Sequence, residues 1–332
     1  MLRALVDARD AHSPAPRGWG RYAAALTSAL ANQPGLDLRL VERGWPGPEL
    51  LFELAGLPLK ARGADVLHVP NCFLPVRRPC PGVVTIHDLA FEAHPEDFAR
   101  KTAWKYRTLT PRAARSAQRV ITPSAFTRDD VVTRYGVDPA KVRVIAEAPT
   151  LAIGSEQPPA GPYLLGVGDL RKKKNFARLA QAFATLHAAG LPHRLVIAGI
   201  DSGEAPAIRA AAAGAPLELP GYVPDGRLDA LMRGADVLVH PSLYEGFGLV
   251  LVEAMARGVP LAVANATALP ETAGDAAVLF DPLDPGDIAA AIRCALEDRD
   301  RLIAAGRARV SELSWERAAA ATADVYREAA AA

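Results

Sequence analysis

The sequence predicts an α/β protein of two Rossmann-like domains in tandem, each with a doubly wound parallel sheet, and with a ligand cleft between them. Three observations lead to this prediction. The chain has 332 residues, and a single hydrophobic core stops growing near roughly 250–300 residues. Short apolar runs alternate with helical patterns almost throughout, as in parallel sheets covered by helices on both faces. A stretch rich in proline and glycine, residues 148–162, interrupts this alternation.

The same alternation gives the order of elements. In the first half the expected strands are 2–6, 66–69, 83–86, 119–121 and 142–145, and the expected helices are 22–31, 100–117 and 125–135. In the second half the expected strands are 163–167, 194–198, 217–219, 237–239, 261–263 and 277–280, and the expected helices are 175–189, 204–213, 225–233, 248–257 and 285–297. A last helix, about 315–329, has no strand after it. We therefore expect a domain over 1–148, a linker over 149–162, a domain over 163–313, and a C-terminal helix in 314–332 that crosses back to the first domain.

The charge balance argues against a polyanionic partner such as nucleic acid, because the net charge is only +1. Residues 1–150 carry 21 basic and 15 acidic side chains, and the remainder carry 17 and 22. A basic half is compatible with an anionic ligand or a membrane surface. Two ordinary solvated surfaces are an equally good interpretation.

Cysteine usage and the chain start favour a cytoplasmic protein. The three cysteines, Cys72, Cys80 and Cys294, have no metal-binding spacing, and a sparse, odd count suits a reducing compartment. Residues 1–7 read as a strand and lack the apolar run of a signal peptide. No stretch reaches the ~20 apolar residues of a membrane span.

The most informative segment is residues 240–260, HPSLYEGFGLVLVEAMARGVP. A strand ends where it begins, a loop follows, and a helix starts near Gly248. Gly246 and Gly248 let the backbone approach a ligand closely, and the N–H groups of a helix start favour an anion. Glu245 and Glu253 are acceptors for hydroxyl groups. The segment is therefore compatible with a polyol ligand that carries a phosphate.

This pattern, two glutamates separated by seven residues, resembles the signature of family 4 glycosyltransferases, the large retaining group with the GT-B fold. The match spans some twenty consecutive residues. The resemblance implies that Glu245 touches the donor sugar and that Glu253 holds the ribose hydroxyls. It assigns the sugar and diphosphate to the backbone amides of Gly246, Phe247, Gly248 and Leu249. An alternative from the residues alone is a loop charge at Glu245 and a solvated helix residue at Glu253.

A second segment, residues 166–175, reads GVGDLRKKKN and lies between a strand and a helix. It resembles the family's G-x-x-x-x-x-K-N segment, which implies that Lys174 contacts the donor phosphates. Asp169 departs from the Arg or Asn of many relatives, and we expect Arg171 to supply the second phosphate contact. The other cations are expected to be exposed, solvated charges: Lys172 and Lys173.

A third segment, residues 17–22, reads RGWGRY after the first strand and resembles the family's G-x-G-R-Y element. The resemblance places Gly18 and Gly20 near the donor, because paired glycines let the chain turn tightly into a helix whose start faces the cleft. A plain turn is the alternative interpretation.

A fourth segment is a buried strand that ends in His87 and Asp88. The resemblance implies that His87 reaches the donor sugar and the reacting centre, and that Asp88 orients it or meets the acceptor. The alternative is a structural histidine whose hydrogen bonds are satisfied within the fold.

The helix near residue 100 is basic. Residues 100–119 contain seven basic side chains and no acidic one, with Trp104, Leu109 and Ala113 among them. One hypothesis is a surface for anionic lipid or for a lipid-linked acceptor. The alternative is a basic solvated helix. The basic residues are Arg100, Lys101, Lys105, Arg107, Arg112, Arg115 and Arg119.

The expected function is that of a retaining glycosyltransferase with His87, Glu245 and Lys174 at its catalytic centre. It would move a mannose- or glucose-type hexose from a GDP- or UDP-linked donor, bound by the second domain, to a hydroxyl of a glycan, lipid or small-molecule acceptor on the first. The segments show no D-x-D run after a strand, so we expect no metal and no cofactor. Alternatives are a nucleotide-sugar epimerase and a non-catalytic nucleotide-sugar-binding protein. A dinucleotide oxidoreductase fits less well, because no G-x-G-x-x-G is present. The oligomeric state stays open.

Overall fold

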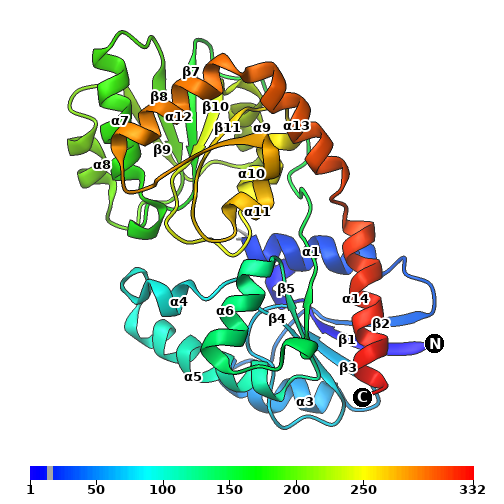
Figure 1. The fold of residues 1–332 in the computed structure, drawn as a ribbon. Coiled ribbons are helices and arrows are strands. Elements are labelled where there is room, and N and C mark those ends of the chain that lie inside the picture. Colours follow the sequence, from blue (N-terminus) through cyan, green and yellow to red (C-terminus); the bar gives the residue numbers. More distant parts are fainter. Residues whose placement is uncertain (13–17) are drawn as a thin grey trace. The chain divides into compact units, whose positions relative to one another are not determined.

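The computed structural model describes residues 1–12 and 18–332, which form two compact units (Figure 1). Unit 1 is Met1–Thr150 together with Leu313–Ala332, and unit 2 is Leu151–Glu312. The chain therefore returns to unit 1 after unit 2 is complete. The proline- and glycine-rich stretch that follows Thr150 forms no helix or strand and belongs to unit 2.

Unit 1 is built on a six-stranded parallel sheet with the order β2-β1-β3-β4-β5-β6. Its strands are β1 (Leu2–Asp7), β2 (Leu36–Val41), β3 (Val66–Val69), β4 (Gly82–Thr85), β5 (Arg119–Thr122) and β6 (Val142–Val144). Its helices are α1 (Gly18–Leu30), α2 (Glu49–Leu51), a π-helical turn (Phe52–Gly56), α3 (Leu57–Lys60), α4 (Ala90–Ala93), α5 (Arg100–Ser116), α6 (Ala125–Tyr135) and α14 (Trp315–Ala330). Short 3-10 turns are Arg9–His12, Pro95–Asp97 and Pro139–Lys141.

The alternation of side chains along these strands separates two cores. Leu5, Leu67 and Val84 point to one face, where they pack with residues of α3, α5 and α6. Ala4 and Val66 point to the opposite face, which α1 and α14 cover. Figure 1 shows α14, in red, lying beside α1, in blue, within this unit. The C-terminal helix is thus one layer of the unit that begins the chain.

Unit 2 contains a second six-stranded parallel sheet with the order β12-β11-β10-β7-β8-β9. Its strands are β7 (Tyr163–Val167), β8 (Arg194–Ala198), β9 (Leu217–Gly221), β10 (Val237–His240), β11 (Leu261–Ala264) and β12 (Ala277–Phe280). Its helices are α7 (Phe176–Ala188), α8 (Ala205–Ala211), α9 (Asp225–Gly234), α10 (Leu249–Ala256), α11 (Leu269–Ala273), α12 (Pro285–Glu297) and α13 (Arg299–Ser311), with 3-10 turns at Lys172–Lys174 and Gly274–Ala276.

Besides the short helices α2, α3, α4 and α11, two longer elements were not predicted from the sequence, β2 and α13. Strand β2 lies at the edge of its sheet and alternates apolar with polar residues, so it lacks the continuous apolar run of the central strands. Helix α13 buries only Leu302 and Gly306, so its apolar periodicity is faint. In both elements little apolar surface is buried in a continuous or periodic pattern, which is the signal that sequence reasoning uses.

Candidate active site

The topology of unit 2 brings two of the predicted segments together. If the strands of unit 2 are numbered 1 to 6 along the chain, starting at β7, their order across the sheet is 3-2-1-4-5-6. The chain first adds β8 and β9 on one side of β7 and then adds β10, β11 and β12 on the other side, so the switch point lies between β7 and β10. Ligands of open α/β sheets bind beyond the carboxyl ends of the strands at such a switch point. Residues 168–175 follow β7 and residues 241–248 follow β10. The two loops with the predicted donor-binding residues are therefore neighbours at the position where this fold places a ligand.

Glu245 lies at the centre of this position, surrounded by cations. Its carboxylate is 2.5 Å from Nζ of Lys174 and 3.7 Å from Nζ of Lys173. Nε2 of His240 lies 3.3 Å from the same carboxylate. His240 is the last residue of β10, and Lys173 and Lys174 lie in the loop that follows β7. The sequence predicted roles for Glu245 and Lys174 separately, and the structure joins them in one buried ion cluster.

The cluster fixes the charge of Glu245. Burial alone would raise the pKa of this carboxyl group, but the ammonium groups of Lys173 and Lys174 outweigh burial and hold the pKa well below its usual 4.5. Burial lowers the pKa of His240, and the two lysines add to this effect. At neutral pH the cluster therefore contains one carboxylate, two ammonium groups and a neutral imidazole, which leaves it net positive. Such a site favours an anion.

The expectation that Lys173 is an exposed charge was wrong. Its side chain is 10% exposed, and Nζ lies 3.4 Å from the carbonyl oxygen of Tyr244. Its backbone carbonyl also accepts a hydrogen bond from Leu243 N–H at 2.8 Å. The cause is the 3-10 turn over Lys172–Lys174, in which successive side chains point about 120° apart. Lys172 is exposed, as expected, while its two successors turn toward residues 241–245.

Asn175 holds the lysine turn in place, a role that the sequence did not reveal. Its φ of +59° is left-handed, a conformation that asparagine tolerates better than most residues. Its side-chain amide donates to the carbonyl oxygens of Pro241 and Pro282 at 3.1 and 2.7 Å. These bonds link the loop after β7 to the loops after β10 and β12. The sequence feature that could have indicated this role is the position of Asn175, directly after the three lysines and directly before α7.

The start of α10 depends on Gly248. This residue is the N-cap of the helix, with φ +94°, and a Cβ here would lie 2.9 Å from Cδ2 of Leu269. The preceding loop is anchored by two hydroxyl groups. Thr267 accepts from Glu245 N–H at 3.0 Å, and Thr272 donates to the carbonyl oxygen of Phe247 at 2.5 Å. The loop that carries Gly246 and Phe247 is therefore held in shape by hydrogen bonds within unit 2, and α10 continues from Leu249.

Glu253 is buried on α10 and is held by partners of its own. One carboxylate oxygen accepts from Leu151 N–H at 2.8 Å and the other from Arg257 Nη1 at 2.9 Å. The side chain of Arg257 is 1% exposed, and it also donates to Asp229 at 2.8 Å and to the carbonyl oxygen of Leu151 at 2.7 Å. Glu253 is therefore no solvated helix residue: it belongs to a buried network that ties the stretch after Thr150 to α9 and α10.

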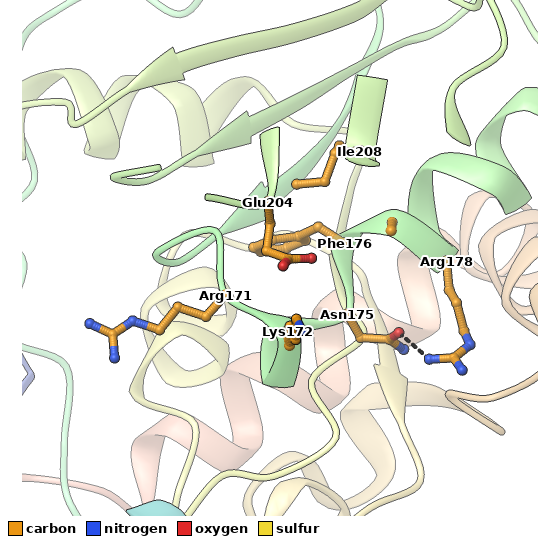
Figure 2. A pocket seen from close by; sticks show the side chains of 8 residues that line it. Arg171, Lys172, Asn175, Phe176, Arg178, Glu204 and Ile208 are labelled. Atoms are coloured by element: carbon orange, nitrogen blue, oxygen red, sulfur yellow. Dashed lines mark hydrogen bonds between the residues drawn. The ribbon is translucent and has the colours of Figure 1, made fainter. Parts of the chain in front are cut away.

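Arg171 lies beside these loops. Its Nη2 is 3.6 Å from Asp169 Oδ2. Figure 2 shows it at one side of a hollow of about 410 Å³, with Arg178 on the other side donating to Asn175 at 2.8 Å. Phe176 also lines the hollow. The partner of Arg171 is Asp169, the residue at which this sequence departs from the family pattern.

In unit 1, both ring nitrogens of His87 have partners. Nδ1 lies 3.0 Å from Glu147 Oε1, and Nε2 lies 2.9 Å from the carbonyl oxygen of Pro70. Burial alone would lower the pKa of His87, but the Glu147 carboxylate and the Pro70 carbonyl raise it above the usual 6.5. An imidazolium that donates from both nitrogens satisfies both contacts. Sequence reasoning missed Glu147, which follows β6 in a segment without a recognisable motif.

Asp88 and the glycine-rich segment begin helices. Oδ1 of Asp88 accepts from Ala90 N–H at 2.9 Å at the start of α4. Helix α1 begins at Gly18, where a Cβ would meet no atom of the described residues within 4 Å, and Gly20 is buried. Arg17, the first residue of that segment, lies outside the described residues. Among the residues that the structure describes, no group of three or more His, Cys, Asp or Glu side chains is arranged to hold a metal ion.

A buried polar chain supports the strand that carries His87. Thr85 Oγ1 is 3.3 Å from the hydroxyl of Tyr22 and 2.8 Å from Nε2 of His68. Nδ1 of His68 is 2.6 Å from the hydroxyl of Tyr326 on α14. Burial lowers the pKa of His68 to about 3, so its ring is neutral and uses one nitrogen as donor and the other as acceptor. The ring of Tyr22 packs edge-on against His87 with centroids 4.6 Å apart.

Two Rossmann-like units with candidate ligand-binding loops at a switch point have the architecture of the GT-B fold. Comparisons with known proteins give the class of enzyme. "Glycosyl transferases group 1" matches residues 153–309, and "Glycosyltransferase Family 4" matches residues 48–147. O-antigen chain mannosyltransferase B from Escherichia coli is 32% identical over 291 residues, which cover 79% of this chain and 74% of that protein. The chain belongs to the family 4 glycosyltransferases, and it is a glycosyltransferase.

Solved structures show the same fold. Sucrose-phosphate synthase from Thermosynechococcus elongatus is 22% identical with a TM-score of 0.76, and the match covers 99% of each chain. Anabaena HepE, solved in complex with UDP and glucose, is 18% identical with a TM-score of 0.71, covering 98% of this chain and 99% of that one.

Proposed function

We propose that this protein transfers a hexose from a nucleoside-diphosphate sugar to an acceptor hydroxyl, with retention of the anomeric configuration. The observation that carries the proposal is the ion cluster of Lys173, Lys174 and Glu245 at the switch point of unit 2. Its net positive charge suits a diphosphate, and its carboxylate suits sugar hydroxyls. Retention is inferred from the retaining family that the sequence resembles.

In the proposed reaction the bond between the anomeric carbon and the phosphate oxygen breaks, and the nucleoside diphosphate leaves with the bonding electrons. Lys174 stabilises the charge that develops on the leaving phosphate, as preorganised cations do in other transfer reactions. Glu245, 2.5 Å from the ammonium group of Lys174, positions that group for this role. The acceptor hydroxyl attacks the anomeric carbon, and its proton passes to the departing phosphate. His87 and Asp88 remain predicted contacts of the sugar and the acceptor.

For the donor we propose a mannose- or glucose-type sugar linked to GDP or UDP. Mannose is supported by the similarity to O-antigen chain mannosyltransferase B, and UDP-glucose by the shared fold with HepE, whose structure contains UDP and glucose. The proposed acceptor is a hydroxyl of a glycan, a lipid-linked saccharide or a small molecule. Neither a metal nor a further cofactor is part of the proposal.

The test begins with thermal shift across a panel of GDP- and UDP-sugars, because a ligand selective for the folded state raises the melting temperature. Nucleotide release is then measured with and without acceptor glycans. A transferase releases nucleotide with acceptor and yields a glycoside, whereas an epimerase yields an altered nucleotide sugar. The anomeric configuration of the product is read by NMR. No stabilisation by any of these donors would refute the proposal.

Lys174→Ala separates catalysis from folding. We expect about a 10²–10³-fold loss of kcat, the typical cost of one preorganised contact to developing charge. The matched control is Lys172→Ala, which removes an exposed lysine from the same turn. Equal turnover of the two variants would remove the role of Lys174.

A further inference from the structure

The guanidinium group of Arg257, the C-cap residue of α10, is enclosed by acceptors. The side chain is 1% exposed. It donates to the Glu253 carboxylate at 2.9 Å, to Asp229 at 2.8 Å and to the carbonyl oxygen of Leu151 at 2.7 Å. A guanidinium group presents its N–H donors in a rigid, planar fork, so these contacts hold it in one orientation.

A closed ring of hydrogen bonds joins Arg257 to Glu253 and to the backbone of Leu151. The Leu151 N–H donates to one carboxylate oxygen of Glu253 at 2.8 Å, and Arg257 donates both to the other oxygen and to the Leu151 carbonyl oxygen. Glu253 and Arg257 lie four residues apart, the spacing that brings two side chains together on one face of a helix. The orientation of the Glu253 carboxylate is therefore set by two donors that the fold itself supplies.

A fixed carboxylate binds a ligand better than a mobile one. A glutamate side chain that is free to rotate loses conformational entropy when a ligand orders it, and that loss weakens binding. In the ring of Leu151, Glu253 and Arg257 this loss occurs when the protein folds. A carboxylate has about four acceptor positions, so one that is held by protein donors can accept from ligand hydroxyl groups as well.

The network around Arg257 also balances the charge of Glu253. Its two carboxylates are Glu253 and Asp229. Its two guanidinium groups are those of Arg257 and of Arg233, which lies 2.8 Å from Asp229. A buried carboxylate without a cation beside it would repel the phosphates of a nucleotide. Because Arg257 supplies that cation, Glu253 can accept hydroxyl groups on the helix that follows the positively charged cluster around Glu245.

We propose that Arg257 is a positioning residue for the nucleotide. It holds the Glu253 carboxylate in the orientation that accepts hydrogen bonds from the ribose hydroxyl groups, and it thereby sets a preference for ribonucleotides over nucleotides that lack these hydroxyl groups. Arg257 acts through Glu253 and does not touch the donor itself. The inference rests on the proposed function, because it requires a nucleoside-diphosphate donor and the predicted ribose contact of Glu253. A purely structural role for Arg257 predicts no effect on this preference.

The test is calorimetric titration of the full chain with UDP, GDP and their 2′,3′-dideoxy forms, at a temperature where circular dichroism shows each variant to be folded. The wild type should bind the preferred ribonucleotide at least about tenfold more tightly than its dideoxy form, because that form lacks the hydrogen bonds to a charged acceptor. Arg257→Met should weaken binding of the ribonucleotide about three- to tenfold, the cost of ordering one flexible side chain. It should leave the affinity for the dideoxy form within about twofold, since that form makes no contact that depends on Glu253.

The matched control is Asp229→Asn, which disturbs the same network without removing a donor from Glu253. Asp229 contacts Arg257 and Arg233, and asparagine keeps an oxygen that accepts from Arg257. This variant should unfold more readily than the wild type and keep the ribonucleotide preference. Arg257→Lys retains a cation with N–H donors but not the planar fork, so it should recover part of the preference that Arg257→Met loses.

The outcomes separate this inference from the proposed function. The role of Arg257 is overturned if Arg257→Met keeps the full preference, if Asp229→Asn loses as much of it, or if the wild type shows no preference. In each of these cases nucleotide binding still supports a nucleotide-sugar donor. Failure of the wild type to bind either UDP or GDP would overturn both proposals. The expected result is a loss of preference in Arg257→Met that Arg257→Lys partly restores.

Discussion

Replacing Arg257 with methionine tests the buried network beneath the predicted ribose contact. Methionine keeps much of the volume but removes the guanidinium that joins Glu253 and Asp229, whose side chains are 6% and 0% exposed. Removing one partner from a buried ion pair costs about 3–5 kcal/mol, because the other charge is left uncompensated. Here Asp229 retains Arg233, and Glu253 retains the N–H of Leu151. We therefore expect a loss near the lower limit, about 3 kcal/mol.

Arg233→Met is the matched control. Arg233 contacts the same carboxylate of Asp229 at 2.8 Å, but its side chain is 26% exposed. Its removal should cost about 1 kcal/mol or less, the usual range for a solvent-screened pair. Both variants remove one guanidinium from Asp229, so the difference between them reports the greater burial of Arg257 together with its contacts to Glu253 and Leu151.

The assay is urea unfolding followed by two signals. All four tryptophans, Trp19, Trp45, Trp104 and Trp315, belong to unit 1, so fluorescence reports on that unit, whereas far-UV circular dichroism reports on both. At an m-value of about 2 kcal/mol/M, Arg257→Met should lower the midpoint of the unit 2 transition by about 1.5 M and leave the fluorescence transition in place. A shift no larger than that of Arg233→Met would refute the reasoning.

Three further predictions concern single residues. Gly248→Ala should destabilise unit 2 by about 1–2 kcal/mol and lower its melting temperature, because alanine is strained at φ +94° and its Cβ meets Leu269 at 2.9 Å; an unchanged melting temperature would contradict this. The pKa of His87 is raised on folding above its usual 6.5, so its pairing stabilises unit 1 fully below about pH 6.5 and this stabilisation is lost as pH rises through the folded pKa. The stability of unit 1 measured by fluorescence should therefore fall over that pH range. Glu147→Gln should make this pH dependence weaker. Tyr326→Phe leaves Nδ1 of buried His68 without its partner at 2.6 Å and should cost unit 1 about 1–3 kcal/mol in the same assay; a smaller change would show that the contact contributes little.

Sequence reasoning predicted the main strands of both sheets and the two loops that meet at the switch point of unit 2, because continuous apolar runs and glycine positions depend on local chemistry. It could not predict which lysine faces inward. Lys173 and Lys172 are identical in type, and only the 3-10 geometry of their turn separates them. Nor could it find Arg257 or Glu147, whose roles depend on partners 28 and 60 residues away in the chain. Pairings of this kind are properties of the folded backbone.

The return of the chain to unit 1 sets the order in which the protein can be completed during synthesis. Helix α14 covers one face of the first sheet and supplies Tyr326 to its interior. The ribosome therefore finishes residues 1–150, and then all of unit 2, before the missing layer of the first sheet emerges. Until then Ala4, Val66 and their neighbours lack part of their apolar cover, so the first sheet is fully covered only after unit 2 has been synthesised.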